Sequence, residues 1–79
     1  MKIYLRIKEK ADADWFSKEY TVAQIPAIGE YVVPASSSEW YQVTAVVYTL
    51  FPEAEFVAEV YAVLTSQVAA AAKAGRLLD

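Results

Sequence analysis

The side chains that most enzymes use for proton transfer and nucleophilic attack are missing from this chain. Its 79 residues include no histidine and no cysteine, so it cannot build a Ser-His-Asp triad, a cysteine nucleophile or a histidine metal site. Carboxylates remain, and a pair of them could hydrolyse glycosides. Three of the four candidate acids lie in or beside expected turns, where exposed acids are common, so a carboxylate enzyme is the least favoured alternative. The candidates are Glu39, Glu53, Glu55 and Glu59.

The sequence also lacks complete motifs for binding calcium or phosphate. Asp12 and Asp14 are spaced like the opening of a calcium loop, but the glycine and the final glutamate of that loop are absent at the required positions. The only glycines are Gly29 and Gly75, which excludes a glycine-rich loop around phosphates. We therefore expect no catalytic residues, no metal and no cofactor.

Aromatic side chains are the most informative groups that remain. The chain has six tyrosines, three phenylalanines and two tryptophans, which could stack on bases, sugars or a hydrophobic ligand. In so small a domain we expect most of them to fill the core or a subunit interface. The best local candidate for a ligand rim follows the triple serine at 36–38. The predicted rim residues are Tyr31, Glu39, Trp40 and Tyr41.

Charge is unevenly distributed along the sequence. The net charge is −3, and residues 21–64 carry five glutamates and no base. Basic residues gather near the N-terminus, so a nucleic-acid-binding small barrel is an alternative function, with Trp15 as a stacking platform. The same bases could instead pair with Glu55 or Glu59 of a neighbouring strand, and nucleic acid is therefore not an expected partner. The bases concerned are Lys2, Arg6, Lys8 and Lys10.

Alternation of apolar and polar residues predicts the first half of the fold. Residues 2–8 alternate strictly, which is typical of a half-buried strand. Residues 15–23 are expected to form a second strand, with a short helix at 15–19 as the rival interpretation. Pro26 and Gly29 then indicate a turn into a short strand at 31–33.

The second half contains the longest predicted strand, at residues 39–51. Its alternation slips near Thr44 and Ala45, which predicts a β-bulge and hence a bent sheet. A turn at 52–54 leads into a strand at 55–64. The alanine-rich residues 65–78 have high helix propensity.

Together these elements predict one domain spanning residues 1–79. We expect a mainly β (α+β) fold: a strongly bent antiparallel sheet or small barrel of about five strands over 1–64, with a C-terminal helix over 65–78. A domain of this size buries only about 60% of the surface that its unfolded chain exposes. Without disulfides or zinc, self-association is the remaining aid to stability.

The last predicted strand indicates how copies of the chain would associate. Both of its faces carry apolar side chains, and an exposed apolar patch usually marks a contact. We expect a homodimer or larger homo-oligomer, and a non-catalytic binding or interaction module that could also take a small-molecule ligand. The predicted interface residues are Tyr48, Val57, Tyr61 and Val63.

The N-terminal segment lacks the apolar core of a secretory signal. The longest weakly polar stretch, residues 56–72, is interrupted by Glu59 and by the polar residues 65–67, which argues against a membrane span. We therefore expect a soluble protein without a membrane partner. The absence of cysteine favours the reducing cytoplasm.

Three segments carry a resemblance to a known group of proteins. These segments are residues 25–32 (IPAIGEYV), 40–48 (WYQVTAVVY) and 56–61 (FVAEVY). In their order they resemble uncharacterised small bacterial β-barrel-like proteins, some of them encoded by integron gene cassettes in mobile DNA. The resemblance implies a small curled β-sheet or barrel. It carries no catalytic residues over to this chain.

Overall fold

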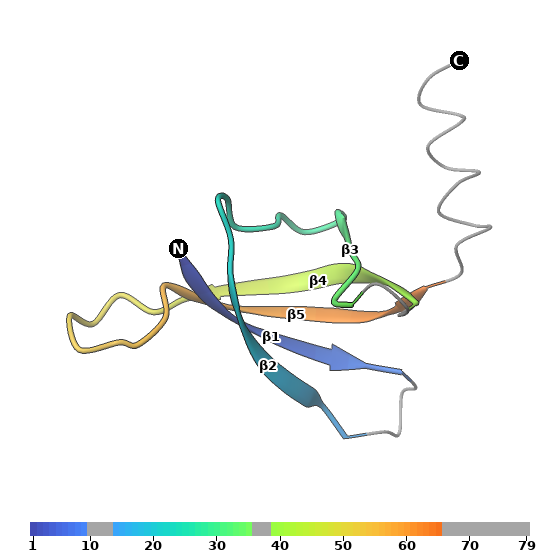
Figure 1. Ribbon diagram of the computed structural model, residues 1–79, viewed down its shortest axis with the longest axis horizontal. Coiled ribbons are helices and arrows are strands. Elements are labelled where there is room, and N and C mark those ends of the chain that lie inside the picture. Colours follow the sequence, from blue (N-terminus) through green and yellow to red (C-terminus); the bar gives the residue numbers. More distant parts are fainter. Residues whose placement is uncertain (10–13, 36–38, 66–79) are drawn as a thin grey trace, which may run out of the picture.

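A computed structural model describes residues 1–9, 14–35 and 39–65, which form a single curled sheet (Figure 1). The sheet has five strands in the order β2-β1-β5-β4-β3. Its edges, β2 and β3, do not pair with each other in the described part of the chain, so the sheet is a half-barrel and not a closed barrel. The strands are β1 (Lys2–Lys8), β2 (Phe16–Thr21), β3 (Tyr31–Val32), β4 (Trp40–Tyr48) and β5 (Ala58–Thr65).

The pairing in the middle of the sheet corrects one expectation. Three of the four pairings are antiparallel, but β1 and β5 run parallel. The prediction of an entirely antiparallel sheet was therefore wrong. The chain forms a β1–β2 hairpin and a β3–β4–β5 meander. These two units join through the pairing of β1 with β5. Hairpins are antiparallel by construction, whereas the strand pair that joins two units has no such restriction.

Most predicted strands occur near their expected positions. Residues 16–21 form a strand, so the helical alternative at 15–19 was wrong. The bulge is confirmed, because the register between β4 and β5 shifts between Val43 and Ala45 and leaves Thr44 without a cross-strand partner. β4 is shorter than predicted and ends at Tyr48. β5 begins at Ala58 and includes Thr65, the first residue of the predicted helix, while residues 66–78 lie outside the described part of the chain.

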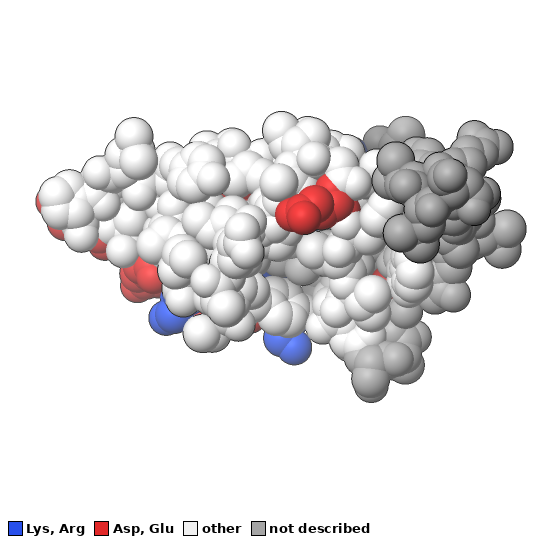
Figure 2. Space-filling view, turned by 90° about the horizontal axis from the view of Figure 1, so that it is seen from above, with Lys and Arg blue, Asp and Glu red and all other residues white. Residues whose placement is uncertain are grey.

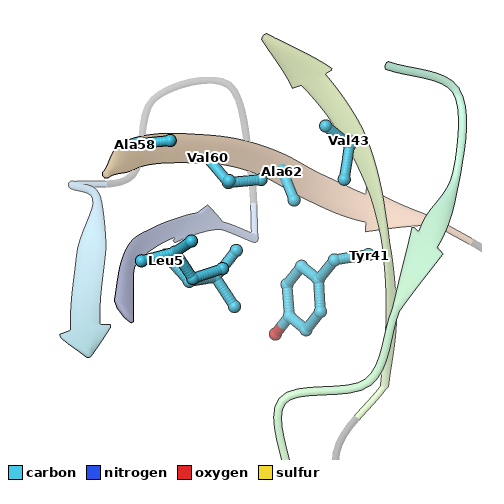
Figure 3. Close-up of a cluster of buried hydrophobic side chains, with 7 residues drawn as sticks. Leu5, Tyr41, Val43, Ala58, Val60 and Ala62 are labelled. Atoms are coloured by element: carbon cyan, nitrogen blue, oxygen red, sulfur yellow. The ribbon is translucent and has the colours of Figure 1, made fainter. Parts of the chain in front are cut away.

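The core lies on the concave face of the sheet. On β5, the alternate residues Ala58, Val60 and Ala62 are completely buried. The small alanines leave room for side chains of β1 and β4 to approach each other over β5, as Leu5 and Tyr41 do in Figure 3. We infer that these two alanines permit the curl of the sheet. The remaining core residues are Ile3, Leu5, Tyr41 and Val43.

The segment between β2 and β3 covers part of this core. Val22 and Ile25 pack against it, and the segment then turns at Gly29, whose φ of 93° lies in the left-handed region that glycine tolerates. The turn is tied to β4, because the Gly29 amide donates to the Val43 carbonyl (2.8 Å) and the Val43 amide donates to the Glu30 carbonyl (2.8 Å). The predicted turn is thus confirmed.

The connection between β4 and β5, residues 49–57, projects from one end of the sheet and is called the arm below (Figure 1). Its base is held by a hydrogen bond from the Thr49 amide to the Val57 carbonyl (3.1 Å) and by one from the Val57 amide to the Lys2 carbonyl (2.9 Å). The Thr49 hydroxyl also donates to the Phe56 carbonyl. The arm is therefore anchored at its base by both backbone and side-chain bonds.

Candidate functional site

Arg6 organises the convex face of the sheet. Its Nη2 and Nε both donate to Glu59 Oε1 of β5, at 2.7 and 3.1 Å, and its Nη1 donates to the Ser17 hydroxyl of β2 at 3.2 Å. The hydrogen bond to Glu59 raises the pKa of Arg6 above its ordinary value, although burial acts in the opposite direction. Arg6 therefore links three adjacent strands, and the expected pairing of a first-strand base with Glu59 is confirmed.

Aromatic rings surround this network. Tyr4 stacks on Phe56 with ring centroids 4.9 Å apart, and the Arg6 guanidinium lies 4.9 Å from the centroid of the Tyr4 ring. Trp15 meets Tyr61 edge to face at 5.2 Å, with the Lys8 ammonium 5.1 Å from the Trp15 ring. Such contacts contribute about 0.5–1 kcal/mol each at exposed sites. Each cation and each ring in this paragraph therefore has an intramolecular partner.

Removal of Arg6 tests this network. Arg6→Met is expected to reduce the free energy of unfolding by about 1 kcal/mol, because the side chains of Arg6 and Glu59 are 32% and 23% exposed and solvent weakens their interaction. Lys2→Met is the matched control, since the Lys2–Glu19 pair is longer (3.8 Å) and about half exposed. The control is expected to change stability by less than about 0.5 kcal/mol. Urea denaturation measures both, and equal losses would contradict a special role for Arg6.

The charges available for phosphate binding are reduced by these pairings. Lys2 and Arg6 each face a carboxylate, and Lys8 lies over a tryptophan ring. Lys10, the fourth base of the nucleic-acid alternative, lies outside the described residues. A nucleic-acid ligand would have to compete with acids for two of these side chains, which disfavours that alternative.

The structure separates the predicted ligand rim between the two faces of the sheet. Tyr31 and Trp40 lie together, with ring centroids 6.2 Å apart. Tyr41 is only 4% exposed and belongs to the core on the other face. Glu39 is exposed and precedes β4. Because neighbouring residues of a strand point to opposite faces, Trp40 and Tyr41 cannot line the same rim.

Burial of Tyr41 has a consequence for stability at high pH. Burial, with smaller contributions from Glu9 and Glu39, raises the pKa of Tyr41 above its ordinary value of 10.0. As the pH rises past that value, the unfolded chain loses the Tyr41 proton before the folded chain does, so the free energy of unfolding falls. Tyr41→Phe is expected to lessen this fall, because phenylalanine has no proton to lose. Denaturant titrations at neutral and alkaline pH measure the difference, and identical pH profiles for the wild type and Tyr41→Phe would contradict it.

The predicted interface residues are likewise divided. Tyr48 and Val57 are 59% and 40% exposed, near the arm. Tyr61 and Val63 are half-buried in β5, and the Tyr61 ring packs against Trp15. Only the first two offer a large free apolar surface.

The exposed apolar residues at this end form a larger group, which we call the apolar tip. Leu50 is 89% exposed and Phe51 is 59% exposed. Neither was singled out from the sequence, because both were expected within a strand that extended to residue 51. The signal that could have found them is their position directly before Pro52, which cannot donate a ladder hydrogen bond. The apolar tip consists of Val47, Tyr48, Leu50, Phe51 and Val57. Val47 and Tyr48 are adjacent in β4, so the tip extends onto both faces of the sheet.

Figure 2 shows one face of the molecule with the arm at its left end. This face is mainly uncharged, and acidic atoms lie along the margin of the arm. The arm therefore combines the exposed apolar residues Leu50 and Phe51 with the exposed acids Glu53 and Glu55.

The four candidate carboxylates are divided between the arm, the residue before β4 and the convex face. Glu39, Glu53 and Glu55 are exposed, and Glu59 is bonded to Arg6. Within residues 1–9, 14–35 and 39–65 there is no group of three or more potential metal ligands. Within the same ranges, no helix has the length and apolar character needed to span a membrane.

Comparisons with known proteins add no constraint to this geometry. No family model, curated protein or solved structure matches the chain. The resemblance to small bacterial β-barrel-like proteins stays a prediction. The functional argument therefore rests on the surface itself.

Proposed function

We propose that this chain is a non-catalytic interaction module that associates with further copies of itself through the apolar tip. The observation that carries the proposal is the exposure of five large apolar side chains at one end of the molecule, with Leu50 at 89%. Removing apolar surface from water favours association. A contact at the tip would withdraw these side chains from water without disturbing the core.

The size of the core supports self-association. Seven hydrophobic residues are buried in the described part of the chain, and a small domain seldom gains more than about 3–5 kcal/mol from one core. The five side chains of the apolar tip are fewer than the about 20–30 residues that each partner contributes to a standard interface. We therefore expect micromolar or weaker association.

Charge at the tip predicts how association depends on salt. Glu53 and Glu55 lie in the same arm, and a contact between two arms brings like charges toward each other. Added salt screens this repulsion and also favours burial of apolar surface. Association is therefore expected to strengthen with salt, the opposite of binding to nucleic acid.

Sedimentation equilibrium of the full chain tests the proposal. Over micromolar to millimolar concentrations, the average mass is expected to rise with protein concentration and to rise further with added salt. A mass that stays at that of one chain at every concentration and salt level would contradict self-association.

A further inference from the structure

The concave face contains a pocket, distinct from the apolar tip, that could bind a small molecule. It has a volume of about 280 Å³ and lies between β1, the end of β2 and the segment around β3. Ile3 and Leu5 belong to the buried core and form part of its lining, whereas Val33 is 49% exposed. The pocket is lined by Ile3, Leu5, Tyr20, Thr21, Val22, Pro26, Val32, Val33 and Pro34.

The lining determines which ligands are compatible with the pocket. Seven of the nine residues are aliphatic or proline, and none carries a charge. The Tyr20 hydroxyl is already engaged, because it donates to the Pro34 carbonyl at 3.2 Å. This bond ties β2 to the residues that follow β3 and holds two walls of the pocket together. The body of a ligand must therefore be apolar.

A cation with no acidic partner in residues 1–9, 14–35 and 39–65 lies beside this apolar lining. Lys18 is paired in register with Leu5, so both residues belong to the concave face. Its ammonium lies 5.8 Å from the centroid of the Tyr20 ring, which lines the pocket. Among the described residues, no carboxylate lies within ion-pair distance of Lys18, in contrast to Lys2 and Arg6 on the convex face.

We propose that this pocket binds a small amphipathic carboxylate, with its apolar body against Leu5 and Val22 and its carboxylate near Lys18. The volume of about 280 Å³ lies just below the about 300–1,000 Å³ of pockets that hold drug-sized ligands, so the pocket suits a smaller ligand. A linear carboxylate of about eight carbons is such a ligand and serves as the probe. The site is independent of the apolar tip, so either proposal can fail alone.

Titration with three probes of equal chain length tests the proposal. Octanoate, octan-1-ol and octylamine are added below their aggregation limits, and backbone amide shifts are followed by NMR at Ile3, Val22 and Val32, with Tyr61 on the convex face as reference. The wild type is expected to bind octanoate about two- to fivefold more tightly than octanol and octylamine most weakly. In Lys18→Met, octanoate and octanol are expected to bind equally.

A second pair of variants tests the location of the site. Val33→Trp is expected to fill the mouth of the pocket and abolish the shifts, because Val33 is exposed there and the substitution does not crowd the core. Ile28→Trp is the matched control, since Ile28 is 68% exposed and does not line the pocket. It is expected to bind octanoate like the wild type.

Three outcomes would overturn the proposal. The first is equal affinity of the wild type for octanoate and octylamine, and the second is binding that persists in Val33→Trp. The third is a set of pocket shifts that appears on raising the protein concentration without any probe and disappears in Leu50→Asp. That result would assign the pocket to the arm of a second copy.

Discussion

Replacing Leu5 with alanine is expected to reduce the free energy of unfolding by about 2–5 kcal/mol. Leu5 is 5% exposed and packs in the cluster that joins β1, β5 and β4 (Figure 3). The truncation removes apolar contacts and leaves a cavity, which the short side chains of Ala58 and Ala62 cannot fill. Because one small core rarely supplies more than about 3–5 kcal/mol, this variant is expected to be largely unfolded at room temperature or to melt far below the wild type.

The same substitution at Leu50 is the matched control. Leu50 is 89% exposed, so Leu50→Ala is expected to change the free energy of unfolding of the monomer by less than about 0.5 kcal/mol. Denaturant titrations at a concentration too low for association, followed by tryptophan fluorescence, measure both variants. Equal losses would contradict the assignment of Leu5 to the core and of Leu50 to the surface.

Placing a charge in the apolar tip is expected to weaken self-association by tenfold or more, about 1.4 kcal/mol or above. Leu50→Asp buries a carboxylate in the proposed contact and adds to the repulsion from Glu53 and Glu55, and both effects oppose association. The monomer is expected to stay folded, because Leu50 does not belong to the core cluster. Sedimentation equilibrium gives the association constant.

Ile28→Asp is the control for this variant. It introduces the same charge at a site that is 68% exposed and lies outside the arm. Its association constant is expected to match that of the wild type within about twofold, a small free-energy difference. Equal weakening by both substitutions would point to net charge and would contradict a contact at the tip.

Local patterns predicted much of the sheet. The alternation of residues 2–8 predicted β1, and the slip in phase near Thr44 predicted the bulge, because a bulge inserts one residue and reverses the alternation beyond it. The parallel pairing of β1 with β5 was not predictable in the same way. These strands lie at opposite ends of the sheet-forming region, and no turn sequence between them restricts their relative direction.

The candidate surfaces were less predictable for a different reason. Trp40 and Tyr41 attracted attention as a sequence pair, yet adjacent strand residues face opposite ways, and this rule alone could have separated them. Leu50 and Phe51 were missed because their exposure depends on where β4 ends. That boundary is set by the hydrogen bonds at Thr49 and Val57, which involve residues distant in sequence as well as near neighbours.

Residue-specific NMR during dilution tests the central proposal most directly, because it locates the contact as well as detecting it. On dilution from millimolar to micromolar concentration, the signals of Val47, Leu50 and Val57 are expected to shift, while those of Ile28 and Val33 remain constant. Shifts confined to Val33 and the concave face, or no shifts anywhere, would contradict self-association through the apolar tip.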